Sequence, residues 1–180
     1  MQVKRTTVEK IRIEDINETH SLDPVEVIVE NFEPGTGKIT ISCYGQAWTG
    51  FWGSMGGTVG EFFQRVSNDY LIEKMSNYRA TEPDLEGDCN YLLKLVLEGR
   101  RRGDLEKEEA RAAFEYLSAF YIDREIVMNC QTPEELRCIE GMDEPWYLDW
   151  PKKENSKYAY LSRILDVVRE VIKPEVSSDD

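Results

Sequence analysis

Carboxylates are the most abundant side chains in this sequence that could do chemistry. They gather at positions 84–88 and 143–149, and acidic clusters of this kind hold the divalent ions of nucleases. Neither cluster has a lysine or histidine partner at a recognisable spacing. We therefore favour a protein that acts by binding another macromolecule, and keep a metal-dependent nucleic-acid processing enzyme as the alternative.

The cysteines lack the partners that zinc binding or nucleophilic catalysis requires. Cys43, Cys89, Cys130 and Cys138 form no C-x-x-C pair, and their spacing fits no zinc motif. A cysteine nucleophile needs a base, and the single histidine, His20, lies in a polar stretch where a surface position is expected. We expect small, buried or half-buried cysteines in a reducing compartment, and no catalytic residue, metal or cofactor.

A glycine-rich stretch before an expected helix raises the question of a phosphate site. Residues 53–60 follow the pattern G-x-x-G-G-x-x-G, whereas a dinucleotide-binding turn needs G-x-G-x-x-G. No lysine follows as in a P-loop, and no parallel strand–helix–strand unit is expected. A helix start can still hold an anion, but the pattern disfavours a nucleotide site.

The charge balance narrows the choice of partner. The chain has 35 acidic and 22 basic residues, a net charge of −13. Nucleic-acid backbones and anionic membranes attract clustered lysine and arginine, so direct binding to either is disfavoured. A protein with a basic surface is the expected partner, and long-range attraction would speed the encounter. An acidic surface that only maintains solubility is the simpler alternative.

Acidic residues concentrate in the later part of the chain. Residues 104–180 hold 19 acids and ten bases, against 16 and 12 in residues 1–103. Carboxylates spaced along rigid helices can stand in for phosphates against a basic groove, which predicts an acidic contact face. Helix-dipole preferences alone would explain several of these acids. The candidates are Glu106, Glu108, Glu109, Glu115, Glu134, Glu135, Glu140, Asp143, Glu144 and Asp149.

A second candidate surface is an aromatic segment interrupted by glycines, here called the aromatic turn. Aromatic residues and methionine are enriched at the centres of interfaces, and glycines let a backbone approach a partner closely. The alternative is that the two tryptophans pack in the core beneath the helices. The residues concerned are Tyr44, Trp48, Phe51, Trp52 and Met55.

Strands are expected first and helices afterwards. Alternating apolar and polar residues predict three or four strands before residue 57, and Glu33–Gly37 has the composition of a hairpin loop. Later apolar residues recur at three- and four-residue spacings, as in helices. This order indicates an α+β fold, in which about five C-terminal helices cover an N-terminal antiparallel sheet. We expect a single domain over residues 1–180, with a sheet region (1–57), a helical region (58–174) and an acidic tail (175–180).

Two stretches of the sequence carry a family resemblance. The first, Cys43–Phe63, contains CYGQAW, WGSMG and EFF, and the second runs from Asn155 to Ile164. Together they resemble a family of early-region, non-structural proteins from tailed phages and prophages of Gram-negative bacteria. The resemblance implies a phage-encoded protein of the host cytoplasm. The polar N-terminus and the lack of an apolar run of about 18 residues also predict a cytoplasmic protein.

The resemblance also bears on function. Small acidic phage proteins often bind and disable host defence or DNA-handling proteins, some by imitating the charge of DNA. It therefore implies an acidic accessory protein that binds, and inhibits or modulates, a host protein. A self-associating scaffold that uses the aromatic turn is a further alternative, and the sequence leaves the oligomeric state open.

Overall fold

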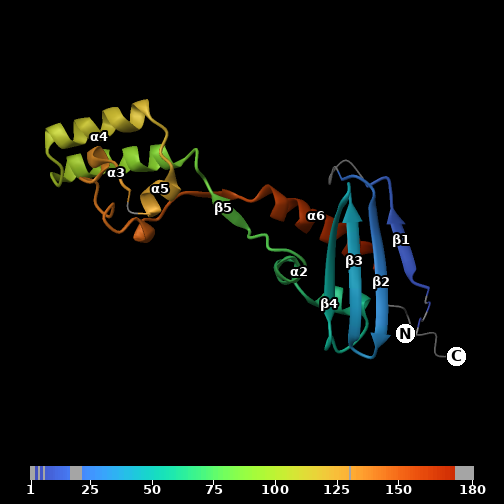
Figure 1. Cartoon of the computed structure of the whole chain (residues 1–180). Helices are drawn as coiled ribbons and strands as arrows, with labels where there is room; N and C mark the ends of the chain where they lie inside the picture. Colours follow the sequence, from blue (N-terminus) through green and yellow to red (C-terminus); the bar gives the residue numbers. More distant parts are fainter. Residues whose placement is uncertain (1–2, 4, 6, 17–21, 130, 173–180) are drawn as a thin grey trace. The chain divides into compact units, whose positions relative to one another are not determined.

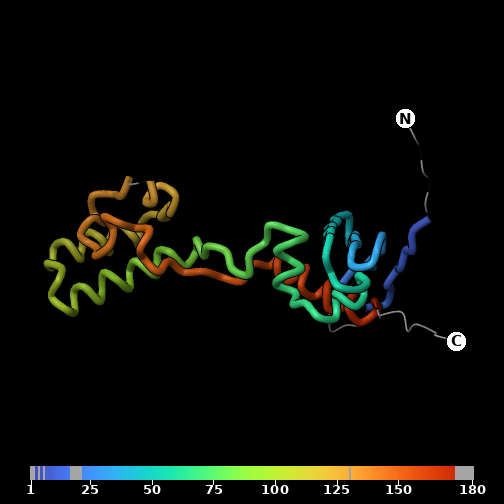
Figure 2. The backbone as a smooth tube through the Cα atoms, turned by 90° about the horizontal axis from the view of Figure 1, so that it is seen from below, coloured from blue at the N-terminus to red at the C-terminus, as the bar shows by residue number. Residues whose placement is uncertain are grey.

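Two compact units make up the computed structural model, which describes residues 3, 5, 7–16, 22–129 and 131–172. Unit 1 combines residues 1–80 and 154–180, and unit 2 comprises residues 81–153. The chain enters unit 2 along β5 (Thr81–Pro83) and leaves along β6 (Lys152–Glu154), and these two short strands pair with each other (Figure 2). His20, Cys130 and the acidic tail lie outside the described residues.

A four-stranded antiparallel sheet forms one layer of unit 1 (Figure 1). Its strands lie in chain order: β1 (Glu9–Ile13), β2 (Val25–Glu33), β3 (Thr36–Cys43) and β4 (Gln46–Trp52). In its centre Ile41 lies between Val27 of β2 and Trp48 of β4, and all three side chains are buried. The alternation of buried and half-buried residues along β3 shows that one face of the sheet packs inward and the other faces outward.

Two tight hairpins connect the last three strands. Glu33 pairs with Thr36 across the Pro34–Gly35 turn, which confirms the predicted antiparallel pairing of the second and third strands. Cys43 pairs with Gln46 across Tyr44 and Gly45, whose φ angles of 46° and 76° lie in the left-handed region. Two consecutive residues with positive φ are the requirement of the tightest hairpin turn, in which strand twist and turn twist agree.

Three helices cover the inner face of the sheet: α1 (Val59–Arg65), α2 (Asn68–Met75) and α6 (Ser156–Val171). The α1 helix begins with a capping box, in which Thr58 and Glu61 satisfy each other's backbone N–H groups. Arg169 of α6 holds the end of α1, because its guanidinium donates to the backbone oxygens of Phe63 and Val66. Hydrophobic side chains from the sheet and these helices form one continuous core.

Unit 2 has a separate core. It contains α3 (Asp88–Arg102), α4 (Lys107–Ala119), α5 (Arg124–Met128) and the short 3₁₀ helices η1 (Glu134–Leu136) and η2 (Pro145–Tyr147). The α3–α4 pair forms a helical hairpin, closed by Gly103 at φ 86°. The buried side chains at its centre come from α3, α4, α5, η1 and the segment after η2: Leu92, Val96, Ala113, Leu117, Val127, Leu136 and Trp150.

The structure confirms the α+β class and the antiparallel N-terminal sheet. It differs from the expectation in where the helices pack, since α3, α4 and α5 surround the core of unit 2 and only α1, α2 and α6 contribute to the core beneath the sheet. The expected helical region also contains β5, β6 and two 3₁₀ turns. One domain over residues 1–180 stays a prediction, because compact units are not by themselves independent folding units.

Candidate functional site

All ten acidic side chains predicted as a contact face are exposed on unit 2. Glu140 lines one hollow of this unit, and three more line a second: Glu109, Glu134 and Glu135. The hollows adjoin at Cys138, which lines both, and together we call them the acidic hollows. The other six acids lie outside them, on or next to α4 or in the 143–149 segment: Glu106, Glu108, Glu115, Asp143, Glu144 and Asp149.

The first hollow has a volume of about 690 Å³ and lies between the end of α3 and the 138–148 segment. Its apolar lining includes Leu95, Leu105 and Leu148. The reversal of the chain at Gly103 brings Asp104 next to Arg102. A lining that combines apolar and charged side chains suits a lysine or arginine side chain, whose stem is apolar and whose head is charged.

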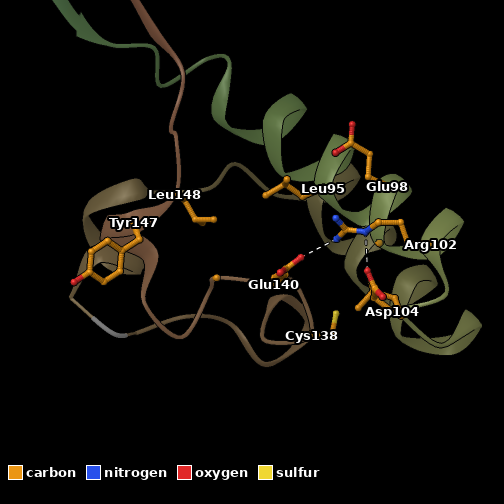
Figure 3. Close-up of a pocket in the computed structure, with 11 residues that line it drawn as sticks. Leu95, Glu98, Arg102, Asp104, Cys138, Glu140, Tyr147 and Leu148 are labelled. Carbon is orange, nitrogen blue, oxygen red and sulfur yellow. Dashed lines mark hydrogen bonds and ion pairs between the residues drawn. The ribbon is translucent and has the colours of Figure 1, made fainter.

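Arg102 organises the charge of this hollow. Its guanidinium lies 2.7 Å from a carboxylate oxygen of Glu140 and 2.7 Å from one of Asp104. Dashed lines mark both contacts in Figure 3. The bond to Glu140 and the charges of both carboxylates raise the pKa of Arg102, which therefore stays protonated. The arginine demonstrates that this position accepts a guanidinium between two carboxylates.

The second hollow has a volume of about 540 Å³ and lies between α4 and η1. The carboxylate of Glu109 accepts the backbone N–H of Glu106 at 2.9 Å, which closes a capping box at the start of α4. Within the described part of the chain, neither Glu134 nor Glu135 forms an ion pair. Arg137 also lines this hollow. Glu98 also lines the first hollow, so the two hollows together combine six carboxylates with two guanidinium groups.

Cys138 sits where the hollows meet, but its environment does not activate the thiol. Burial and the charge of Glu109 raise the pKa of Cys138 above its usual value. Its Sγ also lies 3.4 Å from the backbone oxygen of Glu135, in the geometry of a donated hydrogen bond. A nucleophilic cysteine needs the opposite shift, so the acidic hollows are suited to binding rather than covalent chemistry.

The aromatic turn is divided between core and surface. Trp48, Trp52 and Met55 are buried in unit 1, so their side chains are not available to a partner of the folded protein. Tyr44 at the hairpin tip is 83% exposed and Phe51 on the outer sheet face is 62% exposed. The strand alternation places Trp48 and Trp52 on the inner face and Phe51 on the outer one.

The acidic cluster at 84–88 has a structural role. Asp88 is fully buried and forms an ion pair with Arg124, whose guanidinium also donates to the backbone oxygen of Pro151. Asp84 accepts the backbone N–H of Gly87 at 3.2 Å. Among residues 3, 5, 7–16, 22–129 and 131–172, no three His, Cys, Asp or Glu side chains are grouped so that they could hold a metal ion.

The glycine-rich stretch at 53–60 uses its own groups to satisfy the start of α1. The N–H of Thr58 donates to the Glu61 carboxylate at 2.9 Å, and the N–H of Val59 donates to Oδ1 of Asn31 at 2.9 Å. A carboxylate at this position repels an anion. The arrangement therefore explains the glycines and threonine as turn and capping residues rather than as a phosphate cradle.

The acids could be identified from the sequence, but the residues that combine them into hollows could not. Glu98, Arg102 and Asp104 line the first hollow but were outside the predicted face. The short joint between α3 and α4 could have indicated these residues, because a tight reversal of the chain brings together the charges on its two sides. The 140–148 part of the hollow carries no such local signal.

Comparisons with known proteins point to a phage origin. In the described part of the chain no helix is both long and apolar enough to cross a bilayer. Searches of curated proteins and of solved structures gave no match. The model of the family Phage_phiTE_072, described as a phage family, matches residues 1–174 and confirms the phage resemblance. Since this match spans nearly the whole sequence, the chain belongs to the phage protein family Phage_phiTE_072.

Proposed function

We propose that this protein is an acidic phage accessory protein that binds a host protein through the acidic hollows and inhibits or modulates it. The partner presents lysine or arginine side chains, as defence and nucleic-acid-handling proteins do on the surfaces that contact phosphates. The protein acts in the host cytoplasm, where such partners are found.

The observation that carries this proposal is the composition of the hollows. Six carboxylates line them against two arginines, and Glu134 and Glu135 have no ion-pair partner among the described residues. Unit 2 as a whole holds 18 acids and ten bases, a net charge of −8, so the surrounding field also favours a cation.

Charge mimicry follows from the same chemistry. A guanidinium group binds a carboxylate as it binds a phosphate, by two parallel N–H···O bonds. A host groove that uses arginines to hold nucleic acid would therefore accept these glutamates in place of phosphates. Like charge repels nucleic acid itself, so competition with DNA or RNA for the partner is the expected mode of inhibition.

Affinity capture from lysate of the bacterial host tests the proposal. The full chain is used as bait at about 0.01 M and about 0.15 M salt, where charges are felt over about 30 Å and about 8 Å. Two matched variants carry the same change in net charge: E134K/E135K inside the second hollow, and E108K/E115K outside both hollows.

We expect the wild type and E108K/E115K to capture one host protein, which is retained best at low salt. E134K/E135K should not capture it. Capture by all three proteins alike would contradict the assignment to the hollows. Capture of no stable partner by the wild type at low salt would contradict the proposed function itself.

A further inference from the structure

The β4 strand is a sheet edge that carries none of the charged or proline residues that discourage pairing. It is the last strand in the order β1-β2-β3-β4 and lies at one side of the sheet in Figure 1. Its seven residues, QAWTGFW, include no charge and no proline. At the opposite edge β1 has the sequence EKIRI, with three charges in five residues. Charges and prolines are among the features that prevent an edge strand from pairing, and β4, unlike β1, has neither.

The hairpin fixes which backbone groups face outward. Cys43 and Gln46 flank a two-residue turn, and such a flanking pair exchanges both backbone hydrogen bonds. Every second residue of β4 from Gln46 therefore bonds to β3. The N–H and C=O groups of the alternate residues, Ala47, Thr49 and Phe51, point away from the sheet. These three residues are exposed, and no hydrogen bond from elsewhere in the described residues reaches their backbone.

This edge is complementary to itself. Thr49 is the central residue of Gln46–Trp52, so an antiparallel pair centred on two copies of Thr49 includes all seven residues of each strand. Ala47 of each copy then lies opposite Phe51 of the other, which places a small side chain against a large one on the outer face. No charge faces another. All three outward-facing residues of each copy find backbone partners.

We propose that the β4 edge binds the β4 edge of a second copy of this chain, centred on Thr49, and joins two four-stranded sheets into one of eight strands. Phe51 adds apolar contact beside the backbone bonds, since its ring lies 6.4 Å from that of Phe32, which is also exposed. The β4 strand offers no charge that could attract a charged host protein, whereas pairing with an identical strand brings no charges together. This contact does not depend on the acidic hollows.

The dependence on salt concentration distinguishes dimerisation at β4 from partner binding at the acidic hollows. Each copy carries a net charge of −13, so two copies repel each other, and screening strengthens their association. A basic partner held at the acidic hollows dissociates as salt rises. We therefore expect a reversible dimer whose dissociation constant falls as salt rises. Sedimentation equilibrium of the full chain over a concentration series, at about 0.15 M and about 1 M salt, measures it.

Two lysine variants locate the contact. In T49K two lysines face each other across the two-fold axis, and we expect the dimer to weaken by on the order of tenfold or more. T40K is the matched control, because Thr40 lies opposite Thr49 on the inner strand β3 and both substitutions remove the same 3.2 Å hydroxyl contact. T40K should dimerise like the wild type. Circular dichroism checks that each variant is folded.

If T49K does not fold, Thr49→Pro replaces it, since proline there removes only an N–H that faces outward. A wild-type chain that stays monomeric at high concentration in high salt would overturn the proposal. So would a dimer that T49K leaves intact, or one that T40K weakens as much as T49K.

Discussion

Asp88 and Arg124 form a buried ion pair in unit 2. The Asp88 side chain is fully inaccessible and that of Arg124 is 11% exposed, and Nε of Arg124 donates to the Asp88 carboxylate at 2.8 Å. The guanidinium also lies over the Trp150 ring, 5.0 Å from its centroid. Trp150 in turn donates its indole N–H to the backbone oxygen of Pro145 at 2.7 Å. These contacts connect α3, α5 and the segment that leads into β6.

Removal of one member of this pair should destabilise the protein strongly. Asp88→Ala leaves a guanidinium buried without its counter-charge, which typically costs about 3–5 kcal/mol. Urea unfolding of the full chain measures the loss. The control is Glu115→Ala, which breaks the exposed Arg111–Glu115 pair and should leave the unfolding midpoint almost unchanged. Equal, small effects of the two variants would show that the buried pair does not hold unit 2 together.

The aromatic turn should separate into structural and surface residues. Trp48→Ala empties a core position that is 4% exposed, and should lower the free energy of unfolding by about 3–5 kcal/mol. Phe51→Ala removes an exposed ring, and should change it by less than about 1 kcal/mol. Thermal or urea unfolding of both variants gives the comparison. A Phe51→Ala variant as unstable as Trp48→Ala would contradict the burial described for β4.

Two tyrosines of α6 should ionise at a higher pH than an ordinary tyrosine. The phenol of Tyr158 donates to the Asp69 carboxylate, which raises the pKa of Tyr158 to about 12. The hydrogen bond with Cys43 and burial raise the pKa of Tyr160 to about 12. Tyrosinate absorbance measured against pH should therefore show two groups that ionise well above the ordinary value near 10.

The same shifts predict how stability depends on pH. A pKa that is raised on folding adds stability below the unfolded value near 10, and this contribution is lost as pH rises towards about 12. Tyr158→Phe removes the contribution of Tyr158 and should flatten the loss over that range. Identical pH profiles for the variant and the wild type would exclude a strong Tyr158–Asp69 bond.

Much of the fold was predictable because it follows from local pattern. Strand alternation, the capping box at Thr58 and the glycine at the end of α3 are short-range features of the sequence, and each is present in the structure. The assignment of helices to two cores was not predictable, since the apolar stripes of α4 and α6 look alike in sequence. The choice between the two cores depends on contacts between residues far apart in the sequence.

The candidate site was predictable only in composition. The acids of the C-terminal half stood out by number, but their grouping depends on the return of the 134–148 segment to the α3–α4 hairpin. Burial of Trp48 beside exposed Phe51 follows from simple alternation, once the segment is recognised as a strand rather than a turn.

Arg102 should act as an internal competitor for the partner's cation. Arg102→Gln frees the carboxylates of Glu140 and Asp104, both now paired with it, and should raise the affinity for a basic partner by about threefold at low salt. Titration calorimetry with the captured partner measures this change. A fall in affinity would mean that Arg102 instead shapes the hollow for binding.

The most direct test of the central claim is the affinity of the captured host protein for the two charge-matched variants. E134K/E135K and E108K/E115K both change the net charge from −13 to −9, and only the first alters residues that line the acidic hollows. We predict at least a tenfold loss, about 1.4 kcal/mol, for E134K/E135K and a much smaller loss for E108K/E115K. Equal losses for the two variants, or no loss for either, would contradict binding at the acidic hollows.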